Sequence, residues 1–321
     1  MQGVPAEERA AAAGVDPARR SRATGVAFIV GSALAFGAMA ILARYAYADG
    51  VDTPTLLALR FGIAGVCLLA IARYRRLALP RGRDLRAVML LGGAGYGGQA
   101  ATFFVALALA PASLVALLLY LHPALVALLA AAFLHERMNA AKLVALAVAL
   151  VGMTLTVGPA LRGGVGEFPQ LPLGIALALA AAAIYSVYIV VATRLTERVA
   201  PLALSTVVVV SAAVVFAIVA IVNGPRWPAS LSGWLAVTGI ALVSTVAAIT
   251  LFFAGLARVG PTQASTLSTI EPMFTVALAA ALLGERIAPM QLAGGALIVA
   301  AVLLLARAPR ASGPAAIARG T

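Results

Sequence analysis

Glu271 is the residue of this chain whose type and position point most directly to chemistry. The chain has 321 residues, eleven of them acidic, and of these only Glu271 lies in the middle of a long apolar segment. A charged carboxylate at the centre of a bilayer costs on the order of 3 kcal/mol or more, so a carboxylate found there marks a functional site by default. It could exchange a proton or take part in substrate recognition. The structural alternative is a hydrogen bond to a neighbouring helix.

Two hydroxyl residues and a proline accompany Glu271 at helical spacing. Ser268 precedes it by three residues and Thr275 follows it by four, so both share its helix face and are expected to line the same cavity. Pro272 removes a backbone hydrogen bond, which leaves a free carbonyl beside the carboxylate and bends the helix. The sequence therefore predicts a polar pocket at a helix bend, with Glu271 as the coupling or recognition residue.

His122 stands in a matching context, because Pro123 follows it as Pro272 follows Glu271. A histidine titrates near neutral pH, so His122 could belong to a central cavity and take part in coupling. The residues one helical turn away are all apolar, so a histidine that only packs against other helices is an equal alternative. We predict a second helix bend at Pro123.

Arg60 and Tyr185 are further candidates for contacts to a substrate. Arg60 lies about two turns inside the second apolar segment and could hold a substrate carboxylate or pair with Glu271. Alternatively, its side chain reaches along the helix to the outer headgroups. Tyr185 and Tyr188 share a helix face and could offer hydroxyl groups to a polar ligand, although aromatic residues at this spacing more often pack between helices.

These residues lie in a chain with the composition of an integral membrane protein. It is 63% hydrophobic and 11% charged, whereas soluble domains have about 45–50% and about 25%. This excludes a cytoplasmic globular enzyme, a disordered chain and a disulfide-stapled secreted module. The net charge of +12 comes from arginines in short clusters between apolar runs, which is not the continuous basic surface that nucleic-acid binding requires.

The apolar segments predict ten helical passes, since a bilayer core of ~30 Å needs ~20 residues per pass. The uncharged stretch 87–134 is too long for one pass and must turn near Pro111 and Ser113. We therefore predict an all-α integral membrane fold with ten transmembrane helices. They lie at about 24–46, 54–72, 87–134 (two passes), 143–160, 173–193, 200–222, 231–256, 261–283 and 289–306.

The basic residues predict which side of the membrane each end faces. Cytoplasmic loops of membrane proteins carry an excess of Lys and Arg. If both termini are placed inside, 18 of the 23 basic residues lie in inner segments and four in outer loops, while Arg60 lies within the membrane. We therefore predict a multi-pass protein of the inner cell membrane with both termini in the cytoplasm.

The chain contains an internal repeat. Pro272 lies 149 residues after Pro123, and the same spacing relates Phe103 to Phe252. Each repeat holds five predicted helices, and because five is odd the second repeat must be inverted relative to the first. Inverted repeats generate two related states, open to opposite sides around a site near the midplane, which is a transporter architecture. The predicted parts are a tail at 1–23, repeat one at 24–160, a linker at 161–172, repeat two at 173–307 and a tail at 308–321.

Two motif matches fail the test of their context. Residues 93–98 fit G-x-G-x-x-G, but no strand–helix unit surrounds them, so dinucleotide binding is not predicted. His135 and Glu136 begin like a zinc-protease motif, but Asn139 stands where the second histidine is required. We predict no metal site and no cofactor.

A glutamate–arginine pair lies at the membrane end of the fourth helix of each repeat. These pairs are Glu136-Arg137 and Glu285-Arg286. We expect them to form helix-terminal ion pairs or gate contacts, with a structural role preferred.

Several segments resemble the EamA domain of the drug/metabolite transporter superfamily. They are GSALAFGAMAILARYA, LLALRFGIAG, LHPALVALLAAAFLHERMNAAKL and STIEPMFTVALAAALLGERIAPMQLAGGALI. The resemblance covers about residues 25–306, and the chain departs from it at Phe36-Gly37, where many members have Trp-Gly. It implies a proton-linked or facilitative carrier, often an exporter of amino acids or related metabolites.

We therefore expect a secondary transporter that exports a small metabolite, such as an amino acid, by alternating access, with proton coupling through Glu271. Its partners would be the substrate, protons and the lipid bilayer, and not nucleic acid. The alternatives are a membrane-embedded lipid-modifying enzyme and a passive channel. The enzyme would need two acidic or histidine groups converging at one depth, and the channel would ordinarily show rings of like residues.

Overall fold

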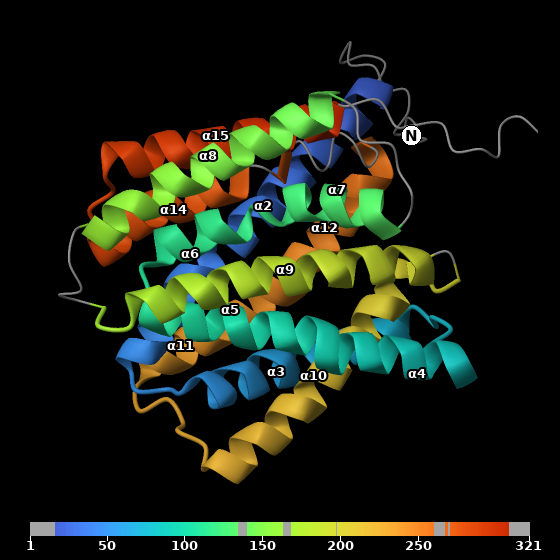
Figure 1. Cartoon of the computed structure of the whole chain (residues 1–321). Coiled ribbons are helices and arrows are strands. Elements are labelled where there is room, and N and C mark those ends of the chain that lie inside the picture. The colour runs from blue at the N-terminus through green and yellow to red at the C-terminus, as the bar shows by residue number, and fades with distance from the viewer. Residues whose placement is uncertain are drawn as a thin grey trace, which may run out of the picture.

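The computed structural model describes residues 17–133, 140–162, 168–196, 198–259, 267–268 and 270–307, and all regular elements in these ranges are helices (Figure 1). The pair Glu136-Arg137, residues 163–167 of the predicted linker and most of the predicted tails lie outside the described residues. The prediction of an all-α, ten-pass membrane fold is confirmed.

The first repeat supplies five passes, two of which are made of more than one helical element. The third pass runs without interruption through a π-helical segment, whereas the fourth turns at Tyr120 and Leu121. Its elements are α2 (Pro17–Ala48), α3 (Thr53–Tyr74), α4 (Gly82–Leu90), η1 (Leu91–Tyr96), α5 (Gly97–Leu109), α6 (Ala112–Leu119), α7 (His122–Phe133) and α8 (Ala140–Arg162).

The second repeat follows the same plan. The eighth pass of the chain, which is the third of this repeat, also contains a π-helical segment. This segment lies at the position that corresponds to η1 in the third pass of the chain. Its elements are α9 (Leu171–Thr196), α10 (Pro201–Asn223), α11 (Leu231–Ala241), η2 (Leu242–Ala247), α12 (Ala248–Val259), α14 (Ile270–Leu283) and α15 (Pro289–Arg307). Short π-helical segments are rare and occur frequently at functional sites.

Five described helices are long and apolar enough to cross a bilayer without interruption. They are Ala23–Ala48, Thr53–Tyr74, Leu171–Ala192, Pro201–Asn223 and Leu231–Phe252. Prolines mark the starts of several helices, as at Pro201 and Pro289, because proline lacks the N–H that a first turn leaves unbonded. After α10 the chain turns at Gly224, whose φ of +75° is a conformation that glycine adopts without strain.

The packing of the helices shows the twofold relation between the repeats. The corresponding second passes α3 and α10 pack together, as do the corresponding fifth passes α8 and α15. Figure 1 shows these two pairs along opposite edges of the bundle. Between them, α2 packs against α12 and α14 just as its counterpart α9 packs against α5 and α7. The first helix of each repeat is therefore held mainly by the other repeat.

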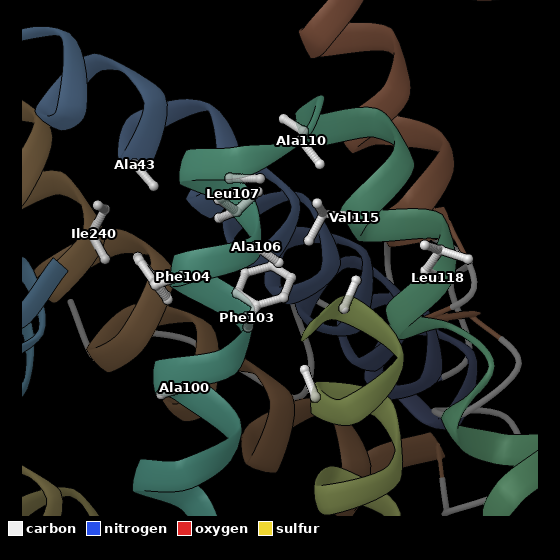
Figure 2. Packing of buried hydrophobic residues seen from close by; sticks show 14 of the residues in the cluster. Ala43, Ala100, Phe103, Phe104, Ala106, Leu107, Ala110, Val115, Leu118 and Ile240 are labelled. Atoms are coloured by element: carbon white, nitrogen blue, oxygen red, sulfur yellow. The ribbon is translucent and has the colours of Figure 1, made fainter. Parts of the chain in front are cut away.

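The core between these helices is built from Ala, Leu and Phe side chains around α5 (Figure 2). Phe103, Phe104 and Leu107 of α5 are at most 4% exposed. They belong to one buried cluster that also includes Ala43 of α2 and Ile240 of α11. Small side chains such as Ala allow helices to approach closely where lipid gives no hydrophobic driving force.

Glycines mark the tightest helix crossings. A Cβ at Gly294 of α15 would lie 2.5 Å from the carbonyl oxygen of Gly152 of α8, so α8 and α15 touch through their backbones there. In η1, a Cβ at Gly92 would lie 2.6 Å from the Cα of Val208 in α10. Backbone contact of this kind fixes the two helix pairs at the edges of the bundle.

Candidate functional site

Glu271 lies in the first turn of α14, where the helices of both repeats meet. Its carboxyl group interacts with the Tyr120 side chain, which closes α6 in the other repeat. Gly37 of α2 packs against the backbone of Glu271, where a Cβ would lie 3.1 Å from the Glu271 carbonyl oxygen. Glu271 is half-buried, so the residue keeps some exposed surface although helices of both repeats pack around it.

The residues predicted to share the face of Glu271 have backbone contacts. The Thr275 hydroxyl lies 3.0 Å from the Gly37 carbonyl oxygen and 3.1 Å from that of Glu271, so it ties α14 to α2. The Ser268 carbonyl oxygen accepts a hydrogen bond of 3.2 Å from the Tyr120 hydroxyl. Pro272 is buried directly after Glu271. These groups hold the surroundings of the carboxyl group.

His122 begins α7, at the turn that interrupts the fourth pass. Its Nδ1 lies 3.0 Å from the Leu119 carbonyl oxygen, and its own carbonyl oxygen accepts a hydrogen bond of 3.2 Å from the Ser186 hydroxyl of α9. Pro123 follows in the first turn of α7 and cannot donate to a preceding carbonyl. The fourth pass is interrupted at Tyr120 and Leu121, just before this proline, and the interruption places a polar turn in the middle of the bundle.

Tyr185 lies against His122 and extends the polar turn into a row of rings. Successive ring centroids are 5.5 Å (Tyr96–Tyr188), 5.8 Å (Tyr188–Tyr185), 4.9 Å (Tyr185–His122) and 5.7 Å (His122–Tyr120) apart. We call these five residues the aromatic row. Its members come from η1, the α6–α7 turn, α7 and α9, so both repeats contribute to it.

Arg60 lies beyond the Tyr96 end of the aromatic row. The side chain is 2% exposed, so the alternative that it reaches to the outer headgroups is wrong. Its Nε donates to the Thr245 Oγ1 at 3.1 Å and its Nη2 to the Tyr96 Oη at 3.4 Å. The guanidinium carbon lies 4.7 Å from the ring centroid of Phe61 and 5.1 Å from that of Phe104.

The structure therefore brings together most of the residues singled out from the sequence. Glu271, His122 and Tyr185 form one cluster through Tyr120, and Arg60 joins it through Tyr96. In the described part of the chain, the hydrogen-bond partners of Arg60 are Thr245 and Tyr96, so pairing with Glu271 is not how its side chain is held.

Two residues of this region were not singled out from the sequence. Tyr96 closes η1 and Thr245 lies in η2, so both come from the π-helical segments. The Thr245 hydroxyl donates at 2.9 Å to the carbonyl oxygen of Ile240, five residues earlier, and accepts from Arg60. Apolar periodicity gives no sign of a π-helical segment, so the sequence offered only the residue types.

A groove of about 590 Å³ lies apart from the aromatic row. It is lined by Arg86, Met89, Leu90, Gly93, Ala94 and Val215, from α4, η1 and α10. Met89 and Leu90 are exposed apolar side chains, so this groove faces the surroundings that would be lipid in a bilayer. We place the candidate site at the aromatic row, where charged and polar groups of both repeats converge.

Glu285 caps a helix of the other repeat. Its carboxylate accepts hydrogen bonds from the backbone N–H groups of Ala112 at 2.7 Å and Ser113 at 3.2 Å, and from the Ser113 hydroxyl at 2.5 Å. The predicted structural role at a helix end thus takes the form of a cap on α6. Because α6 leads directly to Tyr120, this cap positions one end of the site.

Among the described residues, no three His, Cys, Asp or Glu side chains are grouped as a metal site would require. The groups available at the site are a carboxyl group, a guanidinium, an imidazole and phenolic hydroxyls. They can bind a charged or aromatic small molecule through ionic and stacking contacts.

Comparison with known proteins identifies the family. The sequence profile of the EamA-like transporter family matches two segments, residues 23–158 and 172–307. Each matched segment holds one five-helix repeat. This agrees with the internal repeat and with the twofold packing of the helices.

Two proteins similar to this chain are described as amino-acid exporters. The aromatic amino acid exporter YddG of Ancylobacter novellus is 31% identical over 270 residues, which cover 82% of this chain and 89% of that protein. The "Probable terminal-alkyne amino-acid exporter" of Streptantibioticus cattleyicolor is 30% identical over 267 residues, covering 81% and 86%. One solved crystal structure has a TM-score of 0.64 at 26% identity and covers 88% of this chain and 97% of its own. The chain thus belongs to the EamA-like transporter family, and it is a multi-pass membrane transporter rather than an enzyme.

Proposed function

We propose that this transporter exports amino acids with apolar or aromatic side chains, by alternating access between its two repeats. The observation that carries the proposal is the cluster of Glu271, Tyr120, His122 and Tyr185 at the junction of the repeats. A carboxylate among aromatic rings suits a molecule that carries an ammonium group and an apolar or unsaturated side chain. The two named relatives support this substrate class.

The construction of the site suggests how transport and proton movement would be linked. Glu271 belongs to the second repeat and Tyr120 to the first, so a rocking motion of one repeat against the other would change their contact. In its ionised form Glu271 would bind the substrate ammonium group. Protonation of the carboxyl group would release it, so one proton would exchange for one substrate.

The direction of transport follows from the proposed orientation. The excess of basic residues in the inner segments supports an inner-membrane protein with both termini in the cytoplasm. In that orientation, α3, α6 and α11 begin at the outer side, where Glu285 caps α6. An inward proton gradient would then drive export of the amino acid.

The first experiment measures substrate-driven proton movement in proteoliposomes, using phenylalanine, tryptophan, leucine and propargylglycine. We expect at least one of these compounds to move protons in the wild type. Glu271→Gln should slow that movement about tenfold or more, because the amide cannot replace a charge-assisted bond worth a few kcal/mol. Asp84→Asn, in the first turn of α4, is the matched control and should behave as the wild type.

Two outcomes would contradict parts of the proposal. Equal transport in the wild type and Glu271→Gln, without proton movement, would mean that Glu271 is not the coupling residue. Flux that shows no counterflow and no saturation would indicate a channel rather than a carrier. Counterflow of labelled amino acid against unlabelled amino acid therefore belongs in the same set of measurements.

A further inference from the structure

We infer that Arg60, held by Thr245 and Tyr96, binds the carboxylate of the transported molecule and so selects compounds with a free acid group. This inference rests on the proposed function and adds a second recognition point, at the other end of the aromatic row. Glu271 and Arg60 lie near opposite ends of the aromatic row. The two charges therefore suit the two charged groups of amino acids in different parts of the pathway.

The first argument is that Arg60 is buried without a counter-ion among the described residues. The side chain is 2% exposed, and its two hydrogen-bond partners among the described residues, Thr245 and Tyr96, are neutral hydroxyls. Charged side chains within membrane spans are costly and generally pair or serve a transported species. The structure thus holds a permanent positive charge in place and leaves its compensation to a ligand.

The second argument is the number of donors that remain. A guanidinium has five N–H groups in a planar fork that matches a carboxylate. Two bonds are made, by Nε and Nη2, and the described residues give Nη1 no acceptor. A carboxylate is the anion whose two oxygens suit the free edge of the fork.

The third argument is that the guanidinium is fixed before any ligand arrives. The rings of Phe61 and Phe104 lie 4.7 and 5.1 Å from its central carbon. Thr245 donates to the Ile240 carbonyl oxygen, so its hydroxyl oxygen is turned to accept from Nε. A group fixed in its binding geometry loses little conformational entropy when it binds.

The fourth argument concerns what lies beside the fork. Tyr96 bonds to Arg60 and its ring lies 5.5 Å from Tyr188, so a molecule bound by its carboxylate would place its side chain against aromatic rings. Ser244, next to Thr245 in η2, is fully buried, and its hydroxyl has no partner in the described part of the chain. The η2 segment thus contains a buried hydroxyl group that could still form a hydrogen bond with a ligand.

The test compares an amino acid with its amide, which lacks the carboxylate. Uptake and binding of L-phenylalanine, L-phenylalaninamide and 3-phenylpropanoate are measured for the wild type, Arg60→Gln, Arg60→Lys and Thr245→Ala. We expect the wild type to prefer phenylalanine over its amide, and Arg60→Gln to reduce that preference by about tenfold to a hundredfold. Arg60→Lys should keep only part of the wild-type preference for phenylalanine over its amide, because an ammonium group lacks the planar fork of the guanidinium.

The controls separate this inference from the proposed function and from misfolding. Arg226→Gln, at an exposed position, is the matched Arg-to-Gln control and should keep the wild-type preference. If Arg60→Gln does not fold, Thr245→Ala carries the test and should lower the preference severalfold. An unchanged acid-to-amide preference in the folded variant overturns the inference while leaving amino-acid transport intact. A wild type that neither moves nor binds any of the three compounds, nor any of the four amino acids of the first experiment, overturns both.

Discussion

Arg60 and Glu271 carry opposite charges within the spans, and the fold accommodates them by different means. Arg60 is enclosed by two phenylalanine rings and two hydroxyl groups, which spread and satisfy part of its charge. Glu271 faces Tyr120 and stays half-buried. The hydrogen-bond partners of Arg60 are Thr245 and Tyr96 rather than Glu271, so in the proposed function each charge would contact a different charged group of the substrate.

Outside the spans, Asp49 provides a pH-dependent contact between the repeats. Its carboxylate accepts hydrogen bonds from the Ser230 hydroxyl at 2.5 Å and from the N–H groups of Ala229 and Ser230. These bonds, that of the Ser230 side chain first, hold the pKa of Asp49 below its usual value of 3.8. A lowered pKa means that the carboxylate stabilises the folded state above about pH 4, and that this contribution is lost as the pH falls further.

We therefore expect Asp49→Asn to melt at a lower temperature than the wild type at pH 7. The difference should begin to narrow as the pH falls below 3.8, because the carboxyl group of the unfolded wild type then takes up a proton, and it should be lost once the folded-state carboxyl group is protonated as well. Thermal unfolding of both proteins in detergent between pH 3 and pH 7 checks this. A difference that stays constant across that range would show that the ionised carboxylate is not what Asp49 contributes.

At the scale of elements, the site is made where regular α-helix is modified. The aromatic row takes Tyr120 and His122 from the turn in the fourth pass and Tyr96 from the π-helical segment of the third. Such places free backbone groups and turn side chains away from their regular directions. Side chains from other helices must then stabilise the ends of these elements, as Glu285 stabilises the start of α6.

We expect Glu285→Ala to destabilise the protein by about 1–2 kcal/mol, because the first N–H groups of α6 lose their cap. With an unfolding entropy of about 2.1 cal/mol/K per residue over 321 residues, that corresponds to a fall of about 1.5–3 °C in the melting temperature. Arg286→Gln changes the adjacent exposed residue and should leave the melting temperature unchanged. Equal melting temperatures for Glu285→Ala and the wild type would show that α6 does not depend on this cap.

At the scale of the whole molecule, the repeats interlock. The first helix of each repeat packs mainly against helices of the other, and the second and fifth helices pair across the twofold relation. In the proposed alternating access, the repeats would move relative to each other through contacts that exist in two equivalent versions. This arrangement allows two states of similar energy, open to opposite sides.

The proposed orientation of the whole molecule can be tested with fusion reporters. Eighteen of the 23 basic residues lie on the proposed inner side, so we expect a fluorescent protein fused after Thr321 to fluoresce and alkaline phosphatase fused there to be inactive. Alkaline phosphatase inserted after Gly224 should be active, because that turn follows α10 on the opposite side. The reverse pattern would invert the proposed topology.

The sequence by itself determined the number of passes, the repeat and the position of the central carboxylate. Runs of apolar residues, prolines such as Pro123 and Pro272, and a single acidic residue within a span are local features. Their physical consequences follow from bilayer thickness and backbone hydrogen bonding, which do not depend on which helices become neighbours.

Only the tertiary structure decided which groups surround each candidate residue. Arg60 meets Thr245, which is 185 residues away, and Glu285 caps a helix 172 and 173 residues earlier in the chain. These contacts depend on how two inverted repeats pack and on π-helical segments that apolar periodicity does not reveal. Residue types and spacing along one helix carry no information about a partner on another, so the site was assembled by the packing of the repeats.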